Sequence, residues 1–324
     1  MKGKHILGFV LASLLVVSGC SSTSVKENGK DVVASIDDTS ILADDLYTSL
    51  SSSSRGQAAL FDCMLQKLVD EKCPITDDMR KQAEDYVKNT KASFQAQYGD
   101  EAEEQLESQL ASYGYESLDD YEESLIKSLQ SVEFIKKYVK ENYDDVYDDY
   151  YKIANPRQLS LIKVSMADIE NPTDEEKEKL EEVKKLLGSE KDFGDTAASY
   201  SDDTSKTAKG NIGIVDTKTG LSSTYGENVE KKALALKENE ISKAIKGNDG
   251  YYFLKCTSTN KDTIKEELKA VDLESPLLTY DDYITYMAFL SYDLKYDDSD
   301  IEKAIKEYVD QALQSRKESR GDAS

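Results

Sequence analysis

Gly250-Tyr251-Tyr252-Phe253-Leu254-Lys255 is an apolar and aromatic run that predicts a strand, and it closes the stretch of sequence that decides the fold. A second predicted strand, Arg157 to Val164, opens this stretch just after the helix-breaking pair Asn155-Pro156. Between them, Thr173 and Glu176 form a capping box for a helix. The resulting order of strand, helix, helix, strand, helix and strand predicts an α+β module over residues 155–258.

Three further blocks precede the closing strand in a fixed order. They are Phe193 with Ala197-Ala198-Ser199-Tyr200-Ser201-Asp202-Asp203, then Lys209-Gly210-Asn211-Ile212-Gly213, then Leu236-Lys237-Glu238-Asn239-Glu240-Ile241-Ser242. Together the four blocks resemble the parvulin family of prolyl isomerases. In that family the corresponding motifs are F-x-x-x-A-x-x-Y-S-D-D/C, G-G-D-L-G, L-K-x-G-E-I-S and G-Y-H-I-I-K. The resemblance implies a protein that handles other polypeptides.

The resemblance also implies a site. In parvulins the pocket carries two histidines, an Asp or Cys, and a cluster of Leu, Met and Phe. The first histidine falls on Ser160, the second on Tyr252, and the Asp or Cys position on Asp203, a remnant of the catalytic group. The apolar positions of the substrate-binding pocket fall on Ile212, Tyr225 and Val229. Both histidines are absent, which implies weak or lost isomerase activity.

Each polar position also has an ordinary interpretation. A loop acid such as Asp203 caps turns, and Ser160 and Tyr252 fit plain strand positions. Isomerising a prolyl bond needs no nucleophile or metal, because its barrier of ~18–20 kcal/mol comes from amide resonance. An apolar pocket with polar groups that favour the twisted amide suffices. We therefore expect no cofactor and no metal.

The N-terminus predicts an exported lipoprotein. Lys2 and Lys4 precede an apolar run that is too short to be a membrane span, and the run ends at Val17-Ser18-Gly19-Cys20. This end resembles a bacterial lipobox, which implies removal of residues 1–19 and lipidation of Cys20. An ordinary signal peptide with a coincidental cysteine is the alternative. Residues 20–30 are polar, and we expect a lipidated, flexible tether at the outer face of the cell membrane.

Helical patterns lie on both sides of the module. After a strand at Val32 to Ile36 and a turn at Asp37-Asp38, apolar stripes predict the helices of a first block, residues 31–154. Beyond Thr257 the candidates are 273–294 and 301–312, the latter capped by Ser299. These last helices are too few to bury a core alone, so we expect 259–315 to pack on the first block, with a disordered tail at 316–324. The predicted fold is α+β, a mostly helical domain interrupted by the parvulin-like domain.

This order of lipobox, helices, parvulin blocks and helices resembles the PrsA family of extracytoplasmic lipoprotein foldases, and more loosely the periplasmic chaperone SurA. It implies a membrane-anchored chaperone whose partners are unfolded or partly folded secreted polypeptides. Two alternatives stay open: an active isomerase with a nonstandard pocket, and a surface lipoprotein for substrate binding or adhesion. The acidic-aromatic run at residues 142–151 fits either a grip on basic clients or a solvated helix end.

Composition excludes several classes of function. The formal net charge is -23, and no basic stripe exists to neutralise phosphates, so we expect no nucleic-acid partner. His5, the single histidine, lies in the predicted signal peptide, which excludes Ser-His-Asp catalysis and His-ligated zinc in the mature protein. Cys63, Cys73 and Cys256 are expected to be free apolar fillers, with an intermolecular bridge as the alternative.

Overall fold

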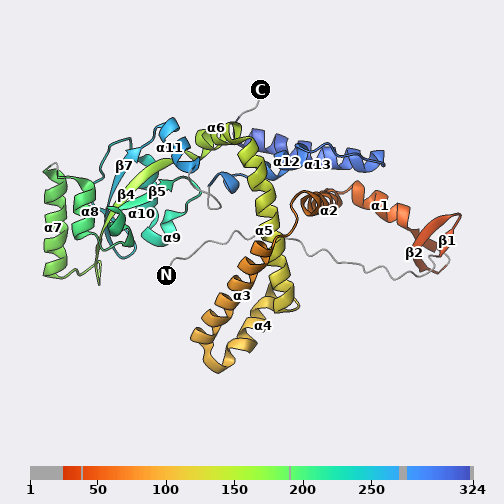
Figure 1. Ribbon diagram of the computed structural model, residues 1–324, viewed down its shortest axis with the longest axis horizontal. Coiled ribbons are helices and arrows are strands. Elements are labelled where there is room, and N and C mark those ends of the chain that lie inside the picture. Colours follow the sequence, from red (N-terminus) through yellow and green to blue (C-terminus); the bar gives the residue numbers. More distant parts are fainter. Residues whose placement is uncertain (1–24, 38, 190, 270–275, 322–324) are drawn as a thin grey trace. The chain divides into compact units, whose positions relative to one another are not determined.

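The computed structural model describes residues 25–37, 39–189, 191–269 and 276–321 (Figure 1). Its contacts divide the chain into two compact units, one from Met1–Lys140 with Asp282–Ser324 and the other Glu141–Asp281. The predicted fold class is confirmed: helices dominate, and an α+β unit interrupts them in sequence. The predicted signal peptide, 1–19, and Cys20 lie outside the described residues. Within those residues, no helix has an apolar run of the length needed to cross a bilayer.

The first unit begins with a small antiparallel sheet in the order β1-β2-β3, followed by helix α1. These elements are β1 (Lys26–Glu27), β2 (Lys30–Ile36), β3 (Thr39–Leu42) and α1 (Ala43–Ser51). The expected turn at Asp37 reverses the chain, with Ile36 paired to Thr39. Two expectations are corrected here. The end of the predicted tether forms β1, which pairs with β2, and a strand, β3, follows the turn where only helices were expected.

The other helices of this unit follow the predicted apolar stripes. They are α2 (Ser54–Lys72), α3 (Asp77–Tyr98), 3-10 helix η1 (Gly99–Glu101), α4 (Ala102–Ser112), α5 (Leu118–Glu141), α12 (Tyr283–Leu290) and α13 (Ser299–Ser319). Thr76 caps α3, its hydroxyl accepting from the Met79 N–H at 3.2 Å. Three expectations near the C-terminus are corrected. The start of the helix predicted at 273–294 lies outside the described residues, and from Pro276 on that range holds the separate helices η3 (Pro276–Leu278) and α12. Asp298 rather than Ser299 caps α13, and α13 includes part of the predicted tail.

The core of the first unit joins its two stretches of sequence. Phe61 in α2 is 3 % exposed, and its ring centroid lies 4.9 Å from that of Phe289 in α12 and 5.4 Å from that of Tyr308 in α13. Phe134 in α5 stacks on Tyr292 at 5.6 Å. The final helices therefore pack on the first helical block.

The second unit contains a four-stranded antiparallel sheet in the order β5-β4-β7-β6. Its elements are α6 (Tyr143–Ala154), β4 (Arg157–Ser165), α7 (Asp174–Gly188), α8 (Phe193–Tyr200), 3-10 helix η2 (Thr204–Ala208), β5 (Asn211–Val215), α9 (Leu221–Tyr225), α10 (Glu227–Ala235), β6 (Ile245–Lys246), β7 (Gly250–Ser258), α11 (Lys261–Lys269) and 3-10 helix η3 (Pro276–Leu278). The predicted capping box of Thr173 and Glu176 starts α7.

Both faces of this sheet are covered by helices (Figure 1). Leu161 of β4 and Leu254 of β7 face α9 and α10, in a core that includes Val229. Ile162 and Phe253, next along the same strands, face α7 and α8. Because successive side chains on a strand point to opposite faces, the two cores alternate residue by residue. This alternation decides which side chains can share a site.

The compact unit extends beyond the expected limits of the module, 155 and 258, at both ends. Helix α6 precedes Asn155, and its tyrosine hydroxyls bond to the α11 region: Tyr143 donates to Lys265 C=O at 2.8 Å and Tyr147 to Lys261 C=O at 2.5 Å. Tyr147 and Tyr150 are fully buried. The tyrosine rings of the acidic-aromatic run at 142–151 therefore form an internal seam, whereas its acids Asp144, Asp145 and Asp148 are exposed, as expected for a solvated helix.

Candidate functional site

Four of the predicted site residues lie together on one face of the sheet. Tyr252 of β7 and Val229 of α10 are fully buried there, and Ile212 of β5 and Tyr225 at the end of α9 pack against the same core, each half-buried. The rings of Tyr225 and Tyr252 meet edge to face with centroids 5.5 Å apart. The result is an apolar wall with two phenol groups beside it.

Ser160 does not join them, which corrects the sequence-based assignment. Its register partner on β7 is Lys255, between Leu254 and Cys256, and the next pairs follow regularly to Lys163 opposite Tyr252. Ser160 therefore shares the face of Ile162 and not that of Tyr252. Among its neighbours it is Leu159 that lies in the core with Tyr252. The position was assigned by counting along a short motif, and a shift of one residue along a strand moves a side chain to the opposite face of the sheet.

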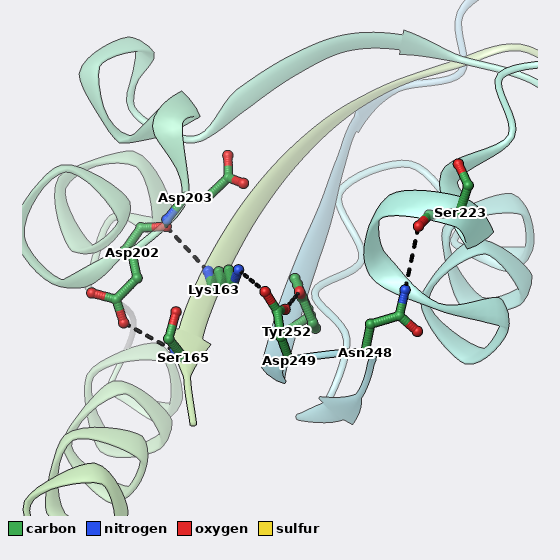
Figure 2. Close-up of polar contacts among 9 residues, drawn as sticks. Lys163, Ser165, Asp202, Asp203, Ser223, Asn248, Asp249 and Tyr252 are labelled. Carbon is green, nitrogen blue, oxygen red and sulfur yellow. Dashed lines mark hydrogen bonds and ion pairs between the residues drawn. The ribbon is translucent and has the colours of Figure 1, made fainter. Parts of the chain in front are cut away.

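A polar network borders the apolar wall (Figure 2). The Lys163 ammonium lies 2.5 Å from one carboxylate oxygen of Asp249, and the Tyr252 hydroxyl donates to the other. Lys163 Nζ is 6.0 Å from the centroid of the Tyr252 ring. Burial opposes ionisation of Asp249, but the hydrogen bonds from Lys163 and Tyr252 hold its pKa below the usual value. Asp249 is therefore a carboxylate at neutral pH.

Asp203 serves first as a cap. Its carboxylate accepts the Ser205 N–H at 2.8 Å at the start of η2. The segment before it is fixed to β4: Asp202 N–H donates to Lys163 C=O at 2.9 Å, and the Asp202 carboxylate accepts the Ser165 N–H at 3.0 Å (Figure 2). Burial first, and then the charge of Asp203 and a hydrogen bond with it, raise the pKa of Tyr225 to about 12. The capping interpretation of Asp203 is thus correct, and the same carboxylate also orients Tyr225.

Lys163 and Asp249 were not anticipated. Lys163 carries a weak signal, because it is one charge inside the apolar strand Leu161 to Val164. Asp249 precedes Gly250 in the turn between β6 and β7, where acids are common. Only the pairing of β4 with β7 brings the two side chains together.

The site offers hydrogen-bond donors without acid-base chemistry at neutral pH. Burial and the neighbouring Asp249 raise the pKa of Tyr252, so both tyrosine hydroxyls stay protonated. The phenol protons of Tyr252 and Tyr225 are used by Asp249 and Asp203, so the Lys163 ammonium is the group that can donate to a carbonyl oxygen, and the apolar wall can hold a small ring. Such a set favours a twisted amide by binding alone, and it contains no activated nucleophile.

The described part of the chain holds no cluster of metal-ligand side chains and no disulfide. Among those residues, no group of three His, Cys, Asp or Glu side chains is placed to hold a metal ion. All three cysteines there are free thiols. Cys73 and Cys256 are buried, as expected for apolar fillers, whereas Cys63 is exposed and fills no core.

Comparison with known proteins agrees with the geometry. Residues 161–258 match the rotamase family, described as the PPIC-type PPIase domain. The chain is 28% identical to foldase protein PrsA 2 of Bacillus cereus, over 86% of this chain and 89% of that protein. It is 27% identical to foldase protein PrsA of Bacillus subtilis, over 86% and 84%, and 26% identical to that of Staphylococcus aureus, over 93% and 91%.

Residues 161–258 are thus a PPIC-type PPIase domain, and the chain as a whole is similar to PrsA foldases. Solved PrsA structures include those from Bacillus subtilis, with a TM-score of 0.36, 21% identity and coverage of 86% of this chain and 98% of that one. For Streptococcus pneumoniae the TM-score is 0.39, the identity 23%, and the coverage 86% and 99%. The matched rotamase domain includes β4 from Leu161 and all of β7, the two strands that carry Lys163 and Tyr252.

Proposed function

We propose that this chain is an extracytoplasmic foldase that holds unfolded or partly folded secreted polypeptides, with a parvulin-like module that binds prolyl segments and turns over weakly. The observation that carries the proposal is the composition of the site. Its apolar wall is kept, at Ile212, Val229 and the Tyr225 ring, while the phenol Tyr252 replaces the second imidazole of the family pattern and Leu159, not an imidazole, lies beside it on β4. We therefore expect the module to keep affinity for prolyl segments while its isomerisation rate is low.

The relatives support the chaperone part. They are foldases by name, and the similarity extends along most of both chains rather than over the rotamase domain alone. A surface lipoprotein for substrate binding or adhesion has no comparable support. The formal net charge of -23 also favours clients that carry positive charge.

Two assays on the full chain test this proposal. Suppression of aggregation of unfolded citrate synthase measures holding, and the isomerisation rate of a proline tetrapeptide measures turnover. We expect clear suppression together with turnover orders of magnitude below that of a histidine-containing parvulin, because each ~1.4 kcal/mol of lost transition-state binding costs tenfold. A rate equal to an ordinary parvulin would establish the alternative, an active isomerase with a nonstandard pocket. Absence of suppression would remove the chaperone assignment.

The same experiments separate holding from the prolyl site when they are repeated with Tyr225→Ala. This change removes a ring of the apolar wall, so prolyl-peptide binding and the residual rate should fall together. Aggregation suppression should stay near the wild-type level, because we place most client contact in the helical unit. Equal loss of both activities would show that the module alone does the holding.

We also propose that Cys20 carries a lipid anchor at the outer face of the cell membrane. The support is the lipobox-like Val17-Ser18-Gly19-Cys20 after a short apolar run. Acyl chains on one cysteine anchor a protein without spanning the bilayer. Cys20→Ala should leave the protein unprocessed or release it to the medium, as judged by membrane fractionation and by mobility. A Cys20→Ala protein that stayed membrane-bound at the mature size would disprove the anchor.

A further inference from the structure

A groove of about 560 Å³ lies at one edge of the sheet in the second unit. One wall is α10, through Asn228 and Lys232, and the other is the segment Glu240–Lys246 that leads into β6. It contains none of the residues assigned to the prolyl site, and Val229 of α10 points instead into the core. The groove is therefore a second surface on the same module.

The segment beside the groove is an incompletely used sheet edge. Ser242 N–H donates to Leu254 C=O at 2.8 Å, and Cys256 N–H donates to Glu240 C=O at 3.0 Å. These two bonds bracket Ile241, which forms an antiparallel bridge with Lys255, so the N–H and C=O of Ile241 point away from β7. Within the described chain, the backbone groups of Ile241, Lys243 and Ala244 make no hydrogen bond.

Such an edge is a template for another strand. A row of unpaired N–H and C=O groups attracts an extended chain, and proteins commonly block it with a helix or a proline. No proline occurs between Glu240 and Lys246. Ile241 is 39 % exposed, and Ile245, four residues on, is half-buried, so the edge also offers apolar contacts.

The charge of the groove selects the partner. Three lysines line it against one acid: Lys232 pairs with Glu240 at 2.7 Å, and Lys246 pairs with Glu170. Lys243 is exposed and has no ion pair among the described residues. This local positive surplus lies in a chain whose formal net charge is -23. An extended segment that carries acidic residues complements it.

We propose that the edge at 241–246 binds an extended, acidic-apolar segment of a client polypeptide as an added β-strand. The client's main chain pairs with the free groups of Ile241 and Lys243, and its acidic side chains meet Lys243. The identity of the occupant as a client rests on the proposed foldase function. The module thus holds a chain at two places, the prolyl site and this edge.

The test uses the full chain and two hexapeptide probes, acetyl-(Val-Glu)3-amide and acetyl-(Val-Lys)3-amide, neither with proline. Isothermal titration calorimetry gives the Kd, and amide hydrogen exchange locates the contact. We expect the glutamate probe to bind and to protect the amides of Ile241, Lys243 and Ala244. The lysine probe should bind at least about tenfold more weakly.

Two variants of Lys243 separate charge from backbone pairing. Lys243→Glu reverses the charge, and Lys243→Pro removes an N–H that makes no bond in the fold. Both should weaken the glutamate probe about tenfold. Lys231→Glu, the same charge change at an exposed position of α10 outside the groove, should leave the Kd within about twofold. Equal thermal unfolding of all three variants shows that the fold is kept.

The outcomes decide the proposal. The proposal is overturned if the glutamate probe does not bind or if neither Lys243 variant changes its Kd. It is also overturned if the probe protects the amides of Tyr225 and Tyr252 instead. Failure of the foldase assignment is distinguishable: citrate synthase would then aggregate freely in the presence of the protein, while the glutamate probe still bound at this edge.

Discussion

The hydroxyl of Tyr150 donates a 2.6 Å hydrogen bond to the carboxylate of Asp216, and both residues are buried. Tyr150 belongs to α6, before the helix-breaking Asn155-Pro156, whereas Asp216 directly follows β5. The ring of Tyr150 also meets Tyr280 edge to face at 5.3 Å. Helix α6 is thus part of the structure that supports the parvulin-like sheet.

Removing this hydrogen bond should destabilise the second unit. Tyr150→Phe leaves the buried Asp216 without its phenol donor, and we expect a loss of about 1–3 kcal/mol in the free energy of unfolding. Urea unfolding of the full chain measures it. Tyr251→Phe is the matched control, because the Tyr251 hydroxyl has no hydrogen bond within the described chain.

Because α6 supplies Tyr150, a fragment 141–281 should be more stable than a fragment 155–258, which lacks this helix. Equal stability of the two fragments would contradict the role given to α6.

Restoring imidazoles should distinguish the two faces of β4. Leu159→His with Tyr252→His places both rings on one face, whereas Ser160→His with Tyr252→His places them on opposite faces. We expect only the first pair to raise turnover of a proline tetrapeptide, by about tenfold or more. Circular dichroism confirms folding of both. If turnover rose only in the Ser160→His with Tyr252→His variant, the site would have to use the other face of β4.

Enlarging the apolar wall is expected to fail. Val229 is fully buried, so Val229→Phe overpacks the core and should cost about 1–3 kcal/mol in thermal or urea unfolding. Ile212 is half-buried at the same wall, and Ile212→Leu, a volume-conserving change, serves as the comparison. An unchanged midpoint for Val229→Phe would reveal free volume that the packing does not show.

The ion pair of Lys163 and Asp249 should make stability depend on acid pH. Since the folded-state pKa of Asp249 is below its ordinary value of 3.8, the pair stabilises the fold above that pH, and its contribution disappears as pH falls through the folded-state pKa. Asp249→Asn should therefore be less stable than wild type near neutral pH, with a difference that shrinks below about pH 4. Asp310→Asn, an exposed change in α13, should show no such trend. A pH-independent difference for Asp249→Asn would argue against the pair.

The parts of the fold that were predictable are local. The box of Thr173 with Glu176 and the apolar stripes of the first block depend on residues within a few turns, and the expected helices were found. The fold class also followed, because the order of apolar patterns fixes the order of elements. The local errors were shifts of one residue: the predicted cap at Ser299 is instead made by the adjacent Asp298.

The site was only half predictable, for a physical reason. Tyr252, Ile212, Tyr225 and Val229 come together because the family motifs fix their elements. Ser160 failed because a shift of one residue reverses the face of a strand, and no residue near it reports the register. Lys163 with Asp249, and Tyr150 with Asp216, are partners that only tertiary pairing creates.

The packing of Phe61 against Phe289 and Tyr308 also sets an order of events during export. A chain emerging from its N-terminus presents α2 long before α12 and α13, with the whole of residues 141–281 still to come. In that interval the second unit, whose strands are all within it, can complete its sheet, while the apolar side of α2 has no partner. Until α12 and α13 emerge, the nascent chain is thus itself an incompletely folded polypeptide with an exposed apolar helix.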